Sequence, residues 1–315
     1  MKNLFILLRI STLMLVIMLF LQLSVMAQEE ATEEAVEETP KDRPVRPAFE
    51  SGLLFDAATT TLQPSKTLEM IIQHRFGTVN NGITDLYGIW APSNIRLGLN
   101  YSILDKFTVG LGATKFNKME DLQLKYKIFE QTRSNSMPVT VVLYEVIGID
   151  GSPKTKWVGA PDSITKTPYA FTNRLSYFTQ LIVSRRFNDH LSLQVAPGFT
   201  HYNRLDSIYN HDRASVSVAG RYKFTPQGSF IFSADFPLDI KNIKDYKIVN
   251  TDATKVFDRP NICVGFEVST STHAFHIYLA SAQGILPQED IMWNKNDFLK
   301  GDILIGLNIT RLWNF

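Results

Sequence analysis

The amino-acid sequence predicts an all-β protein, a transmembrane antiparallel β-barrel of about twelve strands, with ten to fourteen as the range. Three observations predict it: an N-terminal secretory signal, many segments in which apolar and polar residues alternate, and connections that are alternately short and long. The chain has 315 residues, of which 44% are hydrophobic and 20% charged. This length suits one large domain or two medium ones.

The composition excludes several classes of function. The single cysteine excludes an internal disulfide framework, a four-cysteine zinc site and the paired-cysteine haem attachment motif. A formal net charge of +1 leaves no basic excess to neutralise phosphates, so no nucleic-acid partner is expected. The chain contains no nucleotide-binding glycine loop, hydrolase elbow or zincin helix. The sequence therefore predicts no cofactor, no metal and no catalytic residues.

Residues 1–27 have the pattern of a signal peptide. Lys2 and Arg9 precede an uncharged apolar run from Ile10 to Ala27, and small residues before the end of this run suit a signal peptidase. The run of about 17 residues also reaches the lower limit for a membrane span, so an uncleaved anchor is the alternative. Cleavage near Ala27 would release the mature chain outside the cytoplasm.

Residues 28–47 form an acidic, low-complexity leader. Between Gln28 and Arg46 there are seven acidic and three basic residues and almost no apolar ones. Such a segment has too little apolar surface to fold, so we expect a solvated tether in the periplasm whose partner is unknown. The remaining residues, 48–315, are assigned to the barrel.

Alternation of apolar and polar residues defines the strands. In the segment 93–101, Ile95, Leu97, Leu99 and Tyr101 share one parity, and polar residues and glycine occupy the other. This period of two is that of a strand with one apolar and one polar face. Twelve segments are assigned in this way: 68–76, 93–101, 107–114, 122–128, 139–147, 175–186, 191–202, 215–224, 230–236, 262–269, 275–280 and 303–315.

The connections between these segments alternate in length. Five are brief, at 102–106, 131–138, 187–190, 225–229 and 271–274, whereas long ones lie at 77–92, 148–174, 237–260 and 281–302. Short periplasmic turns and long extracellular loops are the plan of outer-membrane barrels. The connection 115–121 is a short exception on the long side. A soluble β-sandwich remains the alternative fold.

The last segment carries a second signal. Trp313 and the terminal Phe315 share the parity of the apolar residues in 303–309, and Arg311 is the exception on that parity. An aromatic C-terminus of this kind resembles the signal by which barrel-assembly machinery recognises its substrates. We therefore expect this machinery and outer-membrane lipid as partners, with Arg311 at the membrane interface.

Sequence blocks in the first third resemble a known family. They are His74-Arg75-Phe76-Gly77, Asn94-Ile95-Arg96-Leu97-Gly98, and Lys125-Tyr126-Lys127 with Gln131. They resemble a family of β-barrel proteins from Bacteroidota whose function is unknown. The resemblance implies an outer-membrane location in a Gram-negative bacterium and supplies no catalytic residues.

Charged residues on the polar parity are the candidates for a lumen. Six are basic and three acidic: Arg75, Arg96, Lys125, Lys127, Arg221 and Lys223 against Glu69, Asp235 and Glu267. Basic residues lining a pore favour anions, so the leading hypothesis is a narrow passive channel or binding barrel for small, anionic solutes. The alternative for these charges is a closed barrel in which they pair with one another.

Two other functions stay open. One is a non-conducting structural or interaction barrel that uses the long loops 148–174, 237–260 and 281–302 for surface contacts. The other is an outer-membrane hydrolase with His74 as its base beside Ser93 or Asn94.

Overall fold

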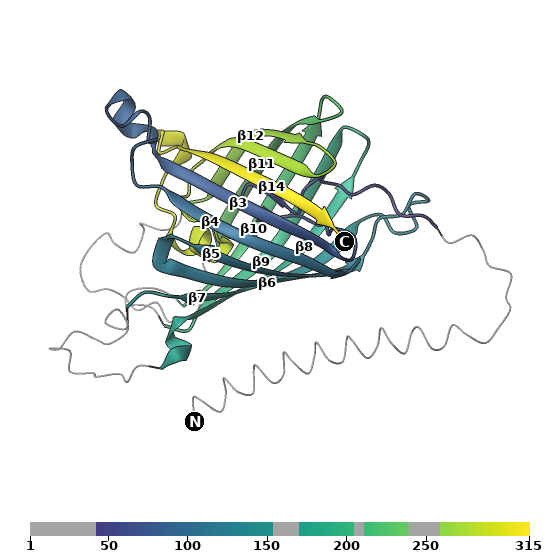
Figure 1. The fold of residues 1–315 in the computed structure, drawn as a ribbon, viewed down its shortest axis with the longest axis horizontal. Coiled ribbons are helices and arrows are strands. Elements are labelled where there is room, and N and C mark those ends of the chain that lie inside the picture. The colour runs from purple at the N-terminus through teal and green to yellow at the C-terminus, as the bar shows by residue number, and fades with distance from the viewer. Residues whose placement is uncertain (1–41, 154–169, 205–210, 239, 241–258) are drawn as a thin grey trace, which may run out of the picture. The chain divides into compact units, whose positions relative to one another are not determined.

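The computed structural model describes residues 42–153, 170–204, 211–238, 240 and 259–315. The signal peptide and most of the acidic leader therefore lie outside the described residues. Twelve strands form a closed antiparallel barrel, in which β14 pairs with β3 to complete the ring. Figure 1 shows this closure, with β14 in yellow beside β3 in blue. The predicted fold class is confirmed, and each of the twelve predicted segments corresponds to one strand of the barrel.

The strands of the barrel follow the chain in order around the wall. They are β3 (Thr67–Thr78), β4 (Asn94–Leu104), β5 (Phe107–Thr114), β6 (Met119–Phe129), β7 (Thr140–Asp150), β8 (Leu175–Arg186), β9 (Leu191–Tyr202), β10 (Asp212–Lys223), β11 (Gly228–Leu238), β12 (Asn261–Ser269), β13 (His273–Ala280) and β14 (Leu304–Asn314). Each pairs with its neighbours in sequence, which is the simplest way to close a sheet and remove its edges.

The two faces of the wall differ as the alternation predicts. On β4, Asn94, Arg96 and Asn100 are buried towards the lumen, whereas Leu97 and Leu99 between them are each 51% exposed on the outer face. A barrel in a membrane needs this arrangement because its outer face contacts hydrocarbon and its backbone groups must pair within the sheet.

The two ends of the barrel differ in their connections. Short turns, such as residues 105–106 and 187–190, join the strands at what we call the short-turn end. The other end, which we call the long-loop end, carries the 3-10 helices η2 (Val79–Asp85), η3 (Phe116–Lys118), η5 (Phe171–Arg174) and η7 (Phe298–Lys300). Parts of the predicted loops 148–174 and 237–260 fall outside the described residues.

Two segments fold into the interior of the barrel. One is the stretch 48–62, which we call the plug; it contains the strands β1 (Leu53–Leu54) and β2 (Ala57–Ala58) of a small hairpin. The other is helix α2 (Pro287–Trp293), whose residues 288–292 are buried. The sequence assigns residues from 48 onward to the barrel, but the plug lies inside it and the wall begins at Thr67. Of the helices in the described ranges, none has the length and apolar character needed to cross a membrane.

Candidate functional site

The plug enters and leaves the lumen at the short-turn end. Before it, Val45 N donates to Gln131 O at 2.9 Å; after it, Ser65 N donates to Asp105 Oδ1 at 2.8 Å. Both acceptors belong to short turns of the wall. The segment 48–62 is therefore a loop held at its two bases, and it can leave the lumen without any break in the barrel wall.

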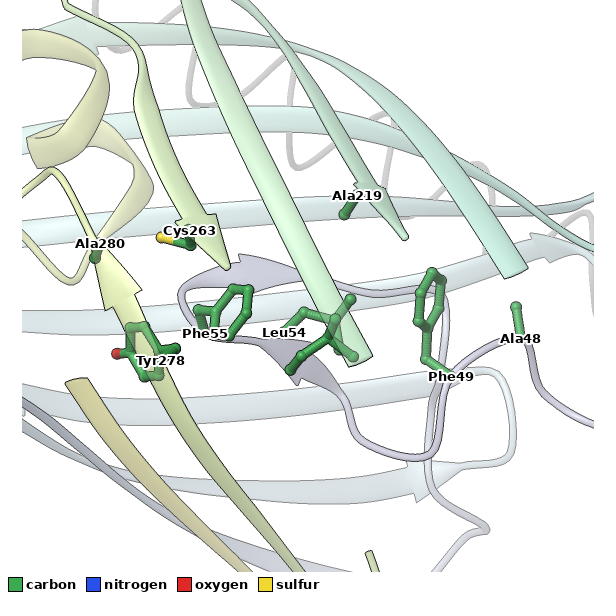
Figure 2. Close-up of a cluster of buried hydrophobic side chains, with 9 residues drawn as sticks. Ala48, Phe49, Leu54, Phe55, Ala219, Cys263, Tyr278 and Ala280 are labelled. Atoms are coloured by element: carbon green, nitrogen blue, oxygen red, sulfur yellow. The ribbon is translucent and has the colours of Figure 1, made fainter. Parts of the chain in front are cut away.

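An apolar contact seats the plug against one side of the wall. Figure 2 shows Phe55 of the hairpin near Cys263 and Tyr278 of the wall, in a buried cluster that also contains Phe49, Leu54, Ala219 and Ala280. The rings of Phe55 and Tyr278 lie 4.5 Å apart between their centroids. This packing accounts for the apolar residues that occur inside an otherwise polar lumen.

The tip of the hairpin has an unusual backbone. Phe55 adopts a φ of 59°, in the left-handed region that bulky residues avoid. Such a conformation costs about 1–3 kcal/mol and persists only where surrounding contacts determine it. The Phe55 carbonyl supplies those contacts, because it accepts from Gln73 Nε2 at 3.0 Å and from Asn308 Nδ2 at 2.5 Å.

Wall side chains also hold the main chain of the plug elsewhere. The carbonyl of Ala58 accepts from Gln194 Nε2 at 2.8 Å. Lys125 Nζ donates to the carbonyls of Gly52 and, at 3.3 Å, of Thr59. The polar face of the barrel therefore binds the plug largely through amide and ammonium donors to its backbone.

Arg75 joins the wall, the plug and the connection before β14. Its Nη2 lies 3.0 Å from Asp56 Oδ2 in a fully buried ion pair. Its Nη1 donates to the carbonyls of Ala282, at 2.6 Å, and of Gly284. One guanidinium thus links three parts of the chain that are far apart in sequence, in the half of the lumen nearer the long-loop end.

Two further carboxyl groups, those of Asp235 and Asp290, lie near this ion pair. Asn261 Nδ2 lies 2.8 Å from Asp56 Oδ2 and 3.4 Å from a carboxyl oxygen of both Asp235 and Asp290. Burial disfavours ionisation of Asp56, but Arg75 outweighs it and keeps the pKa of Asp56 below its usual value. Burial raises the pKa of Asp290 on α2 well above its usual value. Within the described part of the chain, no group of three or more His, Cys, Asp or Glu residues has the arrangement of a metal site.

A second plug carboxylate lies near the short-turn end. Glu50 Oε1 is 2.8 Å from Arg221 Nη1 and 3.0 Å from Lys223 Nζ. Burial opposes ionisation of Glu50, but the hydrogen bond from Lys223 and the charge of Arg221 hold its pKa below the usual value. Three basic residues predicted to face the lumen therefore pair with carboxylates of the plug.

Arg96 differs because its carboxylate partner belongs to the wall. Its Nε and Nη2 donate to the two oxygens of Asp121 at 2.9 and 2.6 Å, and its Nη1 donates to Gln73 Oε1 at 3.0 Å. The bidentate geometry is the strong form of an arginine–carboxylate contact. Lys127, the last of the predicted basic set, pairs with Glu130 of the adjacent turn at 2.7 Å.

The two remaining predicted acidic residues also contact neighbours inside the barrel. Glu69 Oε2 accepts from Asn100 Nδ2 at 2.8 Å. Glu267 Oε2 lies 3.1 Å from His276 Nε2 and 3.3 Å from Ser51 Oγ of the plug. Ser51 also faces Nε2 of His276, so the histidine does not lie between the serine and the acid as it does in a catalytic triad.

Sequence reasoning missed several acidic groups of the lumen. Asp121 shares the inward parity of Gln123 and Lys125, which should have revealed it. Glu50 and Asp56 on the plug, and Glu289 and Asp290 on α2, have no strand pattern that could place them inside. Of these five carboxyl groups, Asp121, Glu50 and Asp56 pair with basic residues of the predicted set.

The structure does not bring His74 together with Asn94, one of the two partners that the hydrolase hypothesis gave it. His74 lies on the outer face of β3, where its ring centroid is 4.3 Å from that of Phe76. Asn94 turns into the lumen and donates to Gln283 O at 3.1 Å. The wall therefore separates His74 from Asn94.

The terminal strand ends at the short-turn end. The Arg311 guanidinium lies 5.1 Å from the centre of the Trp313 ring, and Phe315 is 78% exposed. These positions suit the interfacial placement expected of Arg311.

A small space remains between the plug, the wall and the connection before β14. Its lining includes Gly52, Arg96, Asn100, Lys125 and Leu286. Plug residues form one side of it and residues 285–287 another. The plug and α2 thus fill part of the lumen.

Comparison with known protein families shows which domain family the chain belongs to. The family model of the membrane bound beta barrel domain (DUF5777) matches residues 49–313. The chain belongs to this family. The predicted resemblance to a family of membrane β-barrels is thereby confirmed.

Several solved structures are similar in fold to this family member. The NanC porin is 8% identical, with a TM-score of 0.48 over 79% of this chain and 99% of its own. An outer membrane channel from Pseudomonas putida F1 is 11% identical, with a TM-score of 0.47 over 80% and 97%. Outer membrane phospholipase A from Escherichia coli is 11% identical, with a TM-score of 0.40 over 80% and 95%. A comparison with curated protein sequences gives no match.

Proposed function

We propose that the protein is a gated channel for small anionic solutes in the outer membrane of a Gram-negative bacterium, of the Bacteroidota as its sequence blocks suggest. The plug closes the lumen in the state described here, and solute passes when the plug leaves. In this proposal the short-turn end faces the periplasm. The signal peptide directs export, and the acidic leader continues from the plug into the periplasm.

The observation that carries the proposal is the way the plug is held. Wall side chains donate to its carbonyls at Gly52, Phe55, Ala58 and Thr59, and water can make the same hydrogen bonds. Such a hydrogen bond contributes about 0.5–1.5 kcal/mol net from an amide donor and about 1.5–3 kcal/mol from the Lys125 ammonium, because water replaces the partner that is lost. The strained backbone at Phe55 further favours release.

The charges exposed by release favour anions. Departure of the plug removes Glu50 and Asp56 and leaves Arg221, Lys223 and Arg75 without the carboxylates that pair with them. The wall then presents basic groups at two depths of the lumen. Such groups lower the free energy of a permeating anion relative to a cation.

A permanently closed barrel is the second candidate. It is favoured by the burial of the plug and of α2 inside the barrel. In such a barrel the ion pairs between plug and wall would serve stability alone, and the long-loop end would provide surface contacts.

Cross-linking the plug to the wall separates the two candidates. The single cysteine, Cys263, has its Sγ 3.9 Å from Asp56 Oδ1, so Asp56→Cys places a second thiol beside it. We expect the refolded mature variant to show discrete, anion-preferring steps in planar bilayers when reduced and none when oxidised. The matched control, Asp56→Cys with Cys263→Ser, cannot cross-link and should conduct in both conditions.

Deletion of residues 48–62 tests the same point without a disulfide. The wall strands are intact in this variant, so it should migrate as a heat-modifiable barrel and conduct irrespective of oxidation. A folded deletion variant that carries no current would contradict the channel and establish the closed barrel.

A further inference from the structure

We infer that Arg221 and Lys223 form a binding site for the carboxylate of a small solute, and that Glu50 occupies this site as an internal competitor. The site lies on the inward face of β10 at the short-turn end. The inference rests on the proposed function, since it requires a plug that can leave. It adds the chemical class of ligand and the point at which that ligand competes with the plug.

Glu50 satisfies the two cations incompletely. Both contact the same oxygen, Oε1, at 2.8 and 3.0 Å. The Arg221 side chain is 1% exposed, yet its Nε and Nη1 make no hydrogen bond of acceptable geometry. Buried donors without partners cost free energy. An anion that accepts from more of the Arg221 donors than Glu50 does would remove part of this cost.

Arg96 shows what a satisfied guanidinium looks like in the same lumen. It engages both oxygens of Asp121 through Nε and Nη2, which is the bidentate arrangement. Arg221 has the same fork, but its contact with Glu50 joins Nη1 to the single oxygen Oε1. A free carboxylate is not constrained by the path of the plug and can adopt the bidentate arrangement on Arg221.

Two buried hydroxyl groups extend the site. Ser192 on β9 lies opposite Arg221 in the strand register, and Ser229 on β11 lies opposite Lys223. Each serine is 1% exposed, and neither Oγ has a hydrogen-bond partner among the described residues. Two cations flanked by two hydroxyl donors form a site for the several lone pairs of a carboxylate.

Glu50 is also placed so that it can be exchanged. Its side chain is 38% exposed and that of Lys223 is 24% exposed, whereas Asp56 and Arg75 of the other plug pair are fully buried. A solute arriving at the short-turn end therefore meets the Glu50 contact first. Binding there removes one of the two charge pairs that hold the plug and so favours its release.

Calorimetric titration with sodium succinate tests the site in the full mature chain. Glu50→Gln removes the competing charge but keeps the plug, so it should bind succinate at least tenfold more tightly than the wild type. Adding Lys223→Gln to Glu50→Gln should weaken succinate binding at least tenfold. Lys127→Gln, added to Glu50→Gln as the matched control, removes a cation at the same end and should leave the affinity unchanged.

The titration is repeated with sodium chloride at matched ionic strength and with inorganic phosphate. Equal heats from chloride would overturn the inference, because they would show a non-specific salt effect. Tighter binding of phosphate than succinate would also overturn the assignment of a carboxylate. Absence of succinate binding by a folded Glu50→Gln variant would overturn the site itself.

These outcomes are independent of conductance. Succinate binding that depends on Lys223, together with a silent plug-deletion barrel, would uphold the site and reject the channel. If the deletion barrel conducts but the Glu50→Gln variant binds no succinate, the channel is upheld and the site is rejected. A third measurement links the two: succinate should accelerate modification of Cys263 by a small methanethiosulfonate in the wild type, because Cys263 is covered by the plug.

Discussion

Two kinds of buried ion pair lie in the same lumen, and they differ in the origin of the carboxylate. Arg96 and Asp121 both belong to the wall, on β4 and β6, and neither can leave without unfolding the barrel. Arg75 also belongs to the wall, but its partner Asp56 lies on the plug. The first kind fixes the wall, whereas the second kind joins the wall to a segment that the connectivity allows to move.

The difference matters because of what replaces a lost partner. A wall charge deprived of its partner stays inside a packed lumen, where an unpaired ion is costly. In the release that we propose, the plug carboxylate moves away from its wall cation and water enters the space that the plug leaves. The same interaction chemistry would then hold one region permanently and the other reversibly.

The largest effect is expected from breaking the wall pair. Arg96→Ala leaves Asp121, whose side chain is fully buried, without its charge partner, and should lower the free energy of unfolding by about 3–5 kcal/mol. Urea unfolding of the barrel in lipid vesicles, followed by tryptophan emission, measures it. Arg96→Met with Asp121→Leu removes both charges and should recover most of the loss. A wild-type midpoint for Arg96→Ala alone would show that Asp121 is not confined by the wall.

A buried carboxyl group on helix α2 is expected to make the free energy of unfolding depend on pH. Burial raises the pKa of Glu289 to about 7, with Asn117 as a weak donor and the charge of Asp150 adding to the rise. In the unfolded chain this carboxyl ionises near 4.5, so the folded state holds the extra proton between these two values. Stability should therefore fall as the pH rises from about 4.5 to about 7, by at most about 3 kcal/mol, and then level off.

Urea midpoints at pH 4.5, 6 and 7.5 test this dependence. Glu289→Gln keeps the shape of the protonated acid and should flatten the part of the profile due to this residue, while Asp290 retains its own contribution. Asp302→Asn is the control. Hydrogen bonds to Asp302 lower its pKa, so this residue titrates below the pH range of the test. A profile unchanged by Glu289→Gln would assign the pH dependence to other groups.

A smaller and more local effect is expected from the plug pair. Asp56→Asn removes the charge facing Arg75, which keeps the carbonyl of Ala282 as an acceptor. Loss of a charged hydrogen bond worth about 1.5–3 kcal/mol should raise the rate of Cys263 modification about tenfold to a hundredfold. The urea midpoint of the barrel should change little, in contrast to Arg96→Ala. An unchanged modification rate would show that the Asp56 charge does not hold the plug.

The strands of the wall could be predicted from the sequence, but the plug and α2 inside the barrel could not. Period-two alternation reports which face of a strand meets lipid, so segments such as 93–101 could be placed directly. The plug has no such signal: Leu53-Leu54-Phe55 is apolar because it packs inside the barrel, and the same run would suit a short buried strand of any sheet. Its hairpin and the helix α2 are fixed by contacts with distant strands.

The same limit applies to the candidate site. Parity predicted that Arg75, Arg96 and Arg221 share an environment, but parity does not identify partners. Arg96 meets Asp121 through the strand order β4–β5–β6, which a strand assignment allows one to deduce. The partners of Arg75 and Arg221 come from a segment 19 and 171 residues away in sequence, which only the folded path of the plug brings near.

The smallest effect is expected at Lys127, which belongs to neither kind of buried pair. Its partner Glu130 is 37% exposed and lies three residues along the chain in a short turn, so water solvates the carboxylate when the lysine is lost. Lys127→Ala should therefore change the free energy of unfolding by less than about 1 kcal/mol, several-fold less than Arg96→Ala. Urea midpoints of the two variants, measured in the same vesicles, give the comparison. A loss at Lys127 as large as that at Arg96 would mean that exposure of the partner carboxylate to water does not decide how strongly a wall charge is held.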